Sequence, residues 1–430
     1  MRRLVIAGFF LAVALVVLRG ALTESRMWLS FSGDADFPVY YTAACLVHEH
    51  RDAHLYDRGH ADSNPAYGDA DPGTIFYQIA LARGIQDVRR YIYPPTLADL
   101  MVPLTAFSPV TAQILWDLLN LVGLLYACVL LARIMGIRTL GPTVLVAASI
   151  LLFRPTLNCF YYGQTGVFLF VLLVAGFSLY VRGKTGWAGL LFALAIAVKL
   201  TPLIILVPLL AWRDWKTLRA IALWCVGILG VLLVVNGPHT LALFALGVMP
   251  AMMHRVIDMT NITLDTALQV LWRGAIHGDS VPWVTWLSRM LSLLAVGYAG
   301  WLSLTQPRNT LPLAQVPAVF AVFLLISCCI APISWRHAYV LAAPALAILA
   351  QRIWQGRSSL YQMALALAFL MELSSVKLIA LAKTAETPIF AYLGSMTPIF
   401  GLLLAIAMLH SLRKERIAQV NEPLAAVAAI

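Results

Sequence analysis

Charged side chains are scarce in this chain. Asp, Glu, Lys and Arg make up 12% of its 430 residues, whereas hydrophobic residues make up 61%. Soluble domains have about a quarter charged and about half apolar residues, so the composition excludes an ordinary soluble protein. Together with a mean hydropathy of +0.83, it predicts a polytopic, all-α membrane protein with one membrane domain.

Metal and disulfide motifs are also missing. The six cysteines form no CxxC pair and mostly lie in apolar runs, which favours small apolar packing residues. His50 and His54 have a spacing that can bind a metal on a helix, but such isolated pairs are common in polar loops. We therefore predict no metal site and no cofactor, and leave a requirement for a divalent cation open.

Long apolar runs dominate what is present. The first, residues 4–22 behind Arg2 and Arg3, resembles a signal peptide, but no clean small-residue cleavage site follows, so we expect a retained first transmembrane helix. A bilayer crossing needs about 20 apolar residues. Further candidate spans lie near 108–132, 139–154, 165–181, 218–235, 283–304, 311–333, 337–351, 358–381 and 389–410.

One apolar stretch, residues 186–212, is too long for a single span. The tetrapeptide KLTP at 199–202 interrupts it with a lysine and a proline. Because proline breaks a helix, we expect two short helices that meet at one membrane face. Counting both, the sequence predicts about twelve transmembrane helices.

The charges predict an orientation, because Lys and Arg collect in cytoplasmic loops. If residues 186–212 cross twice, half of the 30 Lys and Arg residues fall in turns on the side of the N-terminus, which we therefore place in the cytoplasm. More than half of the 20 acids lie within residues 21–100. We predict a membrane domain at 1–412, containing a long first extracytoplasmic loop at 21–107, and a short cytoplasmic tail at 413–430.

This topology gathers polar residues from separate stretches on the outer face of the inner membrane. Charges at membrane depth are costly and usually line a functional cavity. Cationic side chains there could hold a phosphate, and an aspartate could accept a proton from a hydroxyl. Transfer from a lipid phosphate would suit this set, which comprises Asp34, Asp36, Tyr93, Arg154, Gln164, Lys199, Trp335, Arg336 and His337.

Five motifs make a more specific resemblance. They are DADFPVYYTAAC followed by HLYD, IYPPTLADLMVPL, NCFYYGQTGVFLFVLL, ALAIAVKLTPLIILVPLL and ISWRHAYVLAAPAL. In this order they resemble glycosyltransferase family 87, whose members have the GT-C membrane fold. The resemblance covers roughly residues 30–350. It implies an inverting enzyme that moves a sugar, typically mannose, from a polyprenyl phosphate to a lipid-linked or polymeric acceptor, without any nucleotide-sugar domain.

The resemblance also implies roles for residues. The aspartate of the first loop falls on Asp36, the expected general base, the lysine of KxTP on Lys199, and the histidine of SWxH on His337. Two positions depart from the pattern of many relatives: Gly166 stands where they have Asn, and Ala338 where they have a second His. These departures bear on the choice of donor or acceptor.

Each candidate also has a simpler interpretation. Asp36 could cap a helix that begins at Phe37-Pro38, and Lys199 could extend to the membrane interface without a role. We nevertheless predict Asp36 as the catalytic residue. The expected donor-binding residues are Lys199, His337, Arg336, Gln164 and Arg154. The expected acceptor or sugar contacts are Asp34, Tyr40, Tyr93 and Trp335.

A membrane transporter or lipid flippase is the alternative function. Broken helices and cations in a membrane cavity occur there as well. Transporters, however, usually show repeated halves and polar residues near the midplane. This chain shows no repeat, and its polar residues gather at one predicted face.

Overall fold

The computed structural model describes residues 2–24, 36–57, 68–252, 256–258, 260–274, 277–304, 315–374 and 392–428. Helices account for almost all regular structure in these residues, which confirms the predicted all-α class. A single two-stranded ribbon joins β1 (Val256–Asp258) to β2 (His277–Asp279). Asp34 lies outside the described residues.

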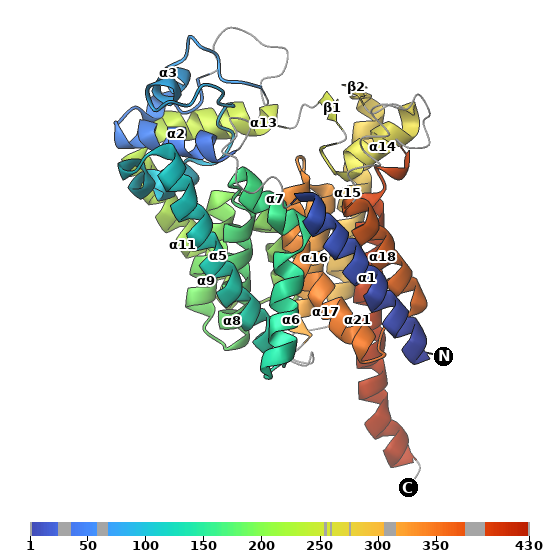
Figure 1. Ribbon diagram of the computed structural model, residues 1–430. Helices are drawn as coiled ribbons and strands as arrows, with labels where there is room; N and C mark the ends of the chain where they lie inside the picture. The colour runs from blue at the N-terminus through green and yellow to red at the C-terminus, as the bar shows by residue number, and fades with distance from the viewer. Residues whose placement is uncertain are drawn as a thin grey trace.

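Most helices run side by side in a body that carries both termini at one end (Figure 1). Three described helices, α5 (Pro109–Ile134), α11 (Trp215–Val235) and α15 (Pro282–Leu304), are each long and apolar enough to cross a membrane. The chain is therefore a multi-pass membrane protein. The number of crossings stays a prediction. The other helices of the body are α1 (Arg2–Glu24), α6 (Leu140–Leu151), α8 (Gly166–Val181), α9 (Thr185–Val198), α16 (Val316–Ile330), α17 (Ala343–Trp354), α18 (Leu360–Leu373) and α21 (Thr397–Ala428).

The opposite end of the body carries a cap of short helices (Figure 1). The predicted first loop forms much of it, with α2 (Phe37–His48), η1 (Asp52–His54), α3 (Ile75–Ala82), α4 (Pro95–Met101) and η2 (Val102–Ala106). The remainder is α12 (Gly237–Ala242), η4 (Leu243–Val248), α13 (Met249–Ala251) and α14 (Leu264–Arg273). Hydrogen bonds from Asn236 Nδ2 to Asp99 (2.9 Å) and from Thr240 Oγ1 to Asp52 (3.2 Å) join the two parts.

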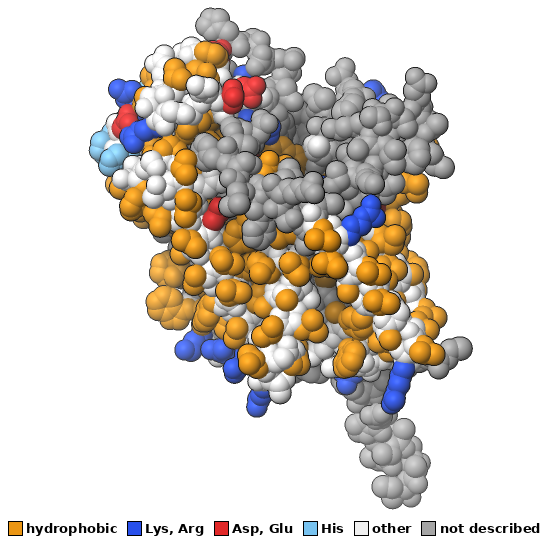
Figure 2. Space-filling model, in the orientation of Figure 1, with side chains coloured by type: hydrophobic (Ala, Val, Ile, Leu, Met, Phe, Trp, Pro, Cys, Tyr) orange, Lys and Arg blue, Asp and Glu red, His pale blue; other side chains and the backbone are white. Residues whose placement is uncertain are grey.

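Charge is distributed unevenly between the two ends. On the face that Figure 2 shows, an apolar band covers the helical body, Lys and Arg gather at the end that carries the termini, and Asp, Glu and His appear on the cap. Lys and Arg also appear on the cap, but their gathering beside one edge of an apolar band is typical of a membrane protein.

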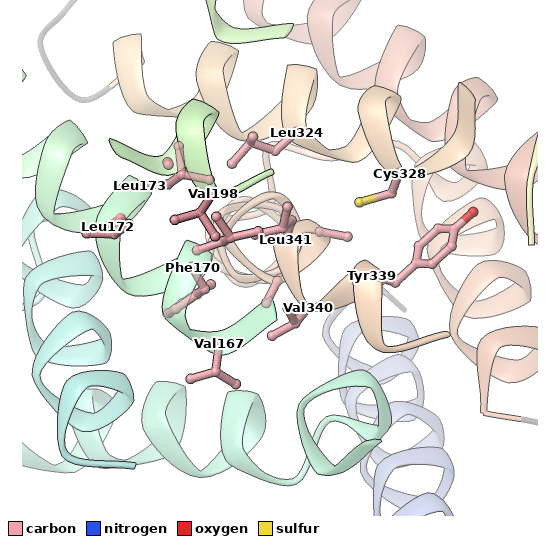
Figure 3. Packing of buried hydrophobic residues seen from close by; sticks show 14 of the residues in the cluster. Val167, Phe170, Leu172, Leu173, Val198, Leu324, Cys328, Tyr339, Val340 and Leu341 are labelled. Carbon is pink, nitrogen blue, oxygen red and sulfur yellow. The ribbon is translucent and has the colours of Figure 1, made fainter. Parts of the chain in front are cut away.

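Helix α16 is the centre of the body. It is apolar on all sides, as expected of a helix buried all round, and every residue from Val316 to Cys329 is buried. Figure 3 shows side chains of α8, α9, α16 and η6 (Arg336–Ala342) converging in this region, including Phe170, Val198, Leu324 and Leu341. The cap and the site described below are thus supported by a packed apolar core.

The predicted break at KLTP is present. Helix α9 ends at Val198, Lys199 is extended (φ −154°, ψ 135°), and the chain continues through η3 (Thr201–Ile205) and α10 (Leu206–Ala211). Gly189 packs against Ala220, so the beginning of α9 lies beside the beginning of α11. The segment after Lys199 must therefore return toward the end where α9 began, as a broken hairpin requires.

Two predicted spans differ from the structure. The span at 337–351 begins as the 3₁₀ helix η6 and becomes α-helical only from Ala343, with Pro344 in the first turn of α17, where its missing N–H costs no helical hydrogen bond. The span at 139–154 ends at Leu151 and bends by 57° into α7 (Arg154–Tyr162), whose second residue is proline. In addition, α21 continues as a helix into the predicted tail.

Close packing at Gly189 gives a test of the fold. A Cβ atom there would lie 2.7 Å from Ala220 Cβ and 3.0 Å from the Ala220 carbonyl carbon, which cannot move aside. We expect Gly189→Val to destabilise the protein by about 1–3 kcal/mol through overpacking. Gly227→Val is the matched control, because nothing lies within 4 Å of a Cβ at that position. Thermal unfolding in detergent should show a lower Tm for Gly189→Val alone, and equal Tm values for the two variants would contradict this packing.

Candidate active site

A tight turn between α7 and α8 forms the base of the site. Helix α7 ends at Tyr162, and Gly163 adopts a left-handed conformation (φ 62°) that reverses the chain. The backbone N–H of Gln164 donates to the Cys159 carbonyl (2.7 Å), and Trp116 Nε1 donates to the Gly163 carbonyl (3.0 Å). A Cβ on Gly163 would lie 2.5 Å from Phe37 Cβ. Only glycine therefore permits both the conformation and the contact.

The turn contacts Asp36, which precedes α2. Asp36 occupies the N-cap position, followed by Phe37 and Pro38 as predicted, but its side chain makes no capping hydrogen bond. The simpler interpretation of Asp36 as a side-chain cap of α2 is therefore not supported. Its backbone N–H donates instead to the Tyr162 carbonyl (3.0 Å), and its Oδ2 accepts a hydrogen bond from Gln164 Nε2. Two motifs more than 120 residues apart meet here.

Two tyrosines complete the surroundings of Gln164. Tyr40 OH donates to Gln164 Oε1 (2.9 Å), and Tyr93 OH approaches the same oxygen (3.5 Å). Their rings pack edge to face, with centroids 4.9 Å apart. Gln164 is 1% exposed and Tyr40 is fully buried. Tyr40 therefore supports Gln164 through a buried hydrogen bond. Its contact with substrate stays a prediction.

Lys199 reaches this group from the broken hairpin. Its Nζ lies 5.6 Å from the centroid of the Tyr93 ring, a cation–π arrangement. Its charge acts on both Asp36 and His337. Within the described part of the chain, Lys199 Nζ has neither a hydrogen bond nor an ion pair. An ammonium group without a carboxylate partner is thus held near the Asp36 carboxylate.

His337 brings the SWRH motif to the same place. It is 4% exposed, and its ring centroid lies 6.2 Å from that of Tyr162 and 5.6 Å from that of Trp335. Its carbonyl accepts a hydrogen bond from Cys159 Sγ (3.3 Å), which joins η6 to α7. A Cβ on Gly166 would lie 2.7 Å from this sulfur, so the glycine at this position suits the close packing.

The surroundings of Asp36 bring the pKa of its carboxyl group closer to neutral pH, where the group is still mostly ionised. Burial raises the pKa of the Asp36 carboxyl from 3.8 to about 6. The hydrogen bond from Gln164 and the positive charges of Arg89 and Lys199 act in the opposite direction and lower this pKa. A carboxylate with such a pKa can accept a proton near neutral pH.

Two residues that act on the site, Arg89 and Asn261, were not identified from the sequence. Arg89, from the stretch before YPP, acts on Asp36 through its charge. Asn261 holds the SWRH turn: its Oδ1 accepts from the Ser334 N–H (2.8 Å), and its Nδ2 donates to the Pro332 carbonyl (3.4 Å). Each is a single polar residue in a polar loop, with no spacing that distinguishes it.

Other predicted residues lie differently. Arg154 is at the far end of α7, about 12 Å along the helix from Tyr162, and its Nη1 donates to the Ser374 carbonyl. The structure therefore does not bring Arg154 to Asp36. Trp335 and Arg336 are half-buried beside His337. The residues described contain no group of three or more His, Cys, Asp or Glu side chains that could hold a metal.

A family model matches more than half of the chain. The family model for glycosyltransferase family 87 matches residues 91–332, a segment that includes Tyr93, Gln164 and Lys199. The chain is also similar to a polyprenol-phosphate-mannose-dependent alpha-(1-2)-phosphatidylinositol mannoside mannosyltransferase of Mycolicibacterium smegmatis, with 25% identity over 70% of this chain and 69% of that protein. The Mycobacterium tuberculosis protein with the same description is 24% identical over 82% of this chain and 81% of its own length.

Solved structures with similarity to the chain include ArnT from Cupriavidus metallidurans. The crystal structure of ArnT in the apo state aligns with a TM-score of 0.40 and 14% identity over 93% of this chain and 78% of that chain. The structure of ArnT bound to undecaprenyl phosphate aligns with a TM-score of 0.41 and 14% identity over 96% of this chain and 78% of that chain.

The close approach of Gly163 to Phe37 can be tested against a second left-handed glycine. Gly136 has φ 79° and nothing within 4 Å of a built Cβ, whereas Gly163 combines φ 62° with the 2.5 Å contact. Alanine at either position should cost about 1–2 kcal/mol in backbone strain, and at Gly163 the clash adds to it. We expect Gly163→Ala to lower the Tm clearly more than Gly136→Ala. Similar Tm values would show that the turn and Asp36 are not held together in this way.

Proposed function

The chain belongs to glycosyltransferase family 87, and we propose that it moves mannose from a polyprenyl phosphate to a lipid-linked or polymeric acceptor. The curated relatives depend on polyprenol-phosphate mannose, which supports this donor. One observation carries the proposal: the Asp36 carboxylate lies in one site with the ammonium of Lys199, and neither group has an ion-pair partner among the residues that the structure describes.

Asp36 acts as the general base in a single displacement. Its carboxylate takes the proton of an acceptor hydroxyl while the hydroxyl oxygen bonds to the anomeric carbon from the face opposite the phosphate. The bond from the anomeric carbon to the phosphate oxygen breaks, and the phosphate leaves with the electron pair, so the configuration inverts. A pKa of about 6 lets Asp36 accept this proton near neutral pH.

Lys199 and His337 bind the donor phosphate. The ammonium offers three hydrogen-bond donors and balances negative charge that grows on the departing phosphate, an interaction that often contributes most to such catalysis. The imidazole ring of His337 lies within reach of the charge of Lys199, between the rings of Tyr162 and Trp335. Arg336, the adjacent residue, is a further donor contact in this proposal.

The site faces the exterior of the cytoplasmic membrane in this proposal. The cap, which supplies Asp36 and Tyr93, lies at the opposite end of the body from both termini (Figure 1), and Lys and Arg gather at the end with the termini (Figure 2). An N-terminus in the cytoplasm follows from the distribution of basic residues, and the cap then lies outside.

Removing the base should abolish transfer without loss of donor binding. Asp36→Asn keeps the size of the side chain but cannot accept the proton, so we expect kcat to fall about 10²- to 10⁴-fold. The measurement uses purified protein in nanodiscs, radiolabelled polyprenyl-phosphate mannose and a membrane lipid extract as acceptor. Asp87→Asn, an exposed loop acid, is the matched control and should keep full activity. Full activity of Asp36→Asn would remove the residue from the base role.

Removing the ammonium of Lys199 should weaken donor binding as well as turnover. A hydrogen bond to a charged group contributes enough for a roughly 10- to 100-fold change in affinity, so Lys199→Met should raise the Kd for labelled donor by that factor. Lys199→Arg should restore part of the binding because it keeps the charge. Lys184→Met, an exposed lysine in the turn before α9, should bind as the unchanged protein does. Unaltered affinity of Lys199→Met would contradict a phosphate contact.

A further inference from the structure

The side chain of Gln164 is hydrogen-bonded at both ends. Its Nε2 donates to Asp36 Oδ2, and its Oε1 accepts from Tyr40 OH (2.9 Å), with Tyr93 OH at 3.5 Å. Gln164 and Tyr40 are both buried, so water does not compete for these groups. The amide thus lies between the carboxylate and two phenols.

This arrangement fixes which way the amide points. The amide has one end that donates and one that accepts, whereas an ionised carboxylate only accepts. If the amide were turned over, Oε1 would face Asp36 Oδ2, and two acceptors would oppose each other in a buried place, which is costly. The Tyr40 hydroxyl, which donates to Oε1, favours the observed orientation. The phenol therefore stabilises an amide direction that favours an ionised Asp36.

The backbone prevents the amide from moving away. Gln164 follows the left-handed Gly163, and its own N–H is bonded to the Cys159 carbonyl (2.7 Å). The Asp36 N–H is bonded to the Tyr162 carbonyl (3.0 Å). The side chains of Gln164 and Asp36 therefore begin on two backbone segments that are hydrogen-bonded to each other.

The two carboxylate oxygens of Asp36 differ as a result. Oδ2 is occupied by Gln164, while Oδ1 has no hydrogen-bond partner in the part of the chain that the structure describes. The charged and titratable groups that face Asp36 are Lys199 and Arg89, which favour its ionised form, and Tyr40 and Cys159, which burial keeps neutral. Oδ1 is thus the oxygen that remains for a proton.

We infer that Gln164 is a positioning residue, aligned by Tyr40, that holds Asp36 Oδ2 so that Oδ1 accepts the proton of the acceptor hydroxyl. This inference rests on the proposed role of Asp36 as the base. It replaces the predicted contact of Gln164 with the donor, because the contacts of the amide lead to Asp36 and the tyrosines. It also explains why Tyr40 is polar although it is fully buried.

A pH profile tests the inference. In the unchanged protein, kcat should fall as the pH drops through about 6, where Asp36 becomes protonated. Gln164→Leu removes a hydrogen bond that favours the ionised form, so the acidic limb should move upward by about one to two pH units. Tyr40→Phe keeps the ring but removes the hydroxyl, and should move the limb in the same direction by less. Gln351→Leu, the same substitution at a half-buried glutamine of α17 that donates to the Met135 carbonyl, should leave the profile unchanged.

A second measurement needs no substrate. Carbodiimides react with protonated carboxyl groups, so labelling of Asp36, located by peptide mass spectrometry, reports its protonation directly in the full-length protein. The pH midpoint of labelling should rise in Gln164→Leu as the acidic limb does. Gln164→Glu provides another variant of similar size, and its added carboxylate should raise the midpoint further through like-charge repulsion.

The outcomes separate this inference from the proposed function. If Gln164→Leu changes neither the acidic limb of the kcat profile nor the pH midpoint of labelling, but raises the KM for the donor, Gln164 contacts the donor and does not position Asp36. A shifted midpoint combined with full activity of Asp36→Asn would leave the alignment of Asp36 intact but refute its role as the base. A shift of both quantities in Gln164→Leu, with an inactive Asp36→Asn, would support both.

Discussion

The structure of the site depends on one backbone contact, between the residue that begins α2 and the turn that ends α7. The Asp36 N–H donates to the Tyr162 carbonyl, and the next residue, Phe37, lies where Gly163 has no side chain. This contact joins the cap to the membrane body. Gln164 can reach Asp36 because the chain reverses at this glycine.

The polar groups of the site fall into two kinds. Gln164, Tyr40 and Asn261 use their hydrogen-bonding groups on other parts of the protein, as buried polar groups generally do. Lys199 and His337 instead have no such bond from their side chains within the described residues. Leaving a cation unpaired next to apolar helices costs free energy. Cationic or titratable residues that keep this cost, beside neighbours such as Gln164 and Asn261 that bond within the protein, are suited to bind a ligand.

The sequence predicted the features that depend on residues close together along the chain. Apolar runs located the helices, and proline located the break after α9. The predicted topology placed Asp36, Gln164, Lys199 and His337 on one face, where the structure brings them together. The sequence did not indicate the contacts of a side chain whose hydrogen-bond partner lies far along the chain. Arg154 has the charge of a phosphate ligand, but the Ser374 carbonyl occupies it. Asp36 has the position and neighbours of a helix cap, but its carboxylate accepts a hydrogen bond from Gln164 instead. Asn261 has no local signal, because its role depends on the chain near Ser334.

The break after α9 has a physical role in placing Lys199. In a continuous helix, the side chain at this position would lie back along the helix toward its N-terminus, and the ammonium would be drawn into the apolar body. The extended conformation of Lys199 turns the side chain out toward Tyr93 instead. A break usually leaves backbone N–H groups without partners, which is costly in a membrane. Pro202 has no N–H, and it lies in the first turn of η3, where that group would have no partner within the helix. The same tetrapeptide therefore supplies the cation, directs it to the site and limits the cost of interrupting the helix.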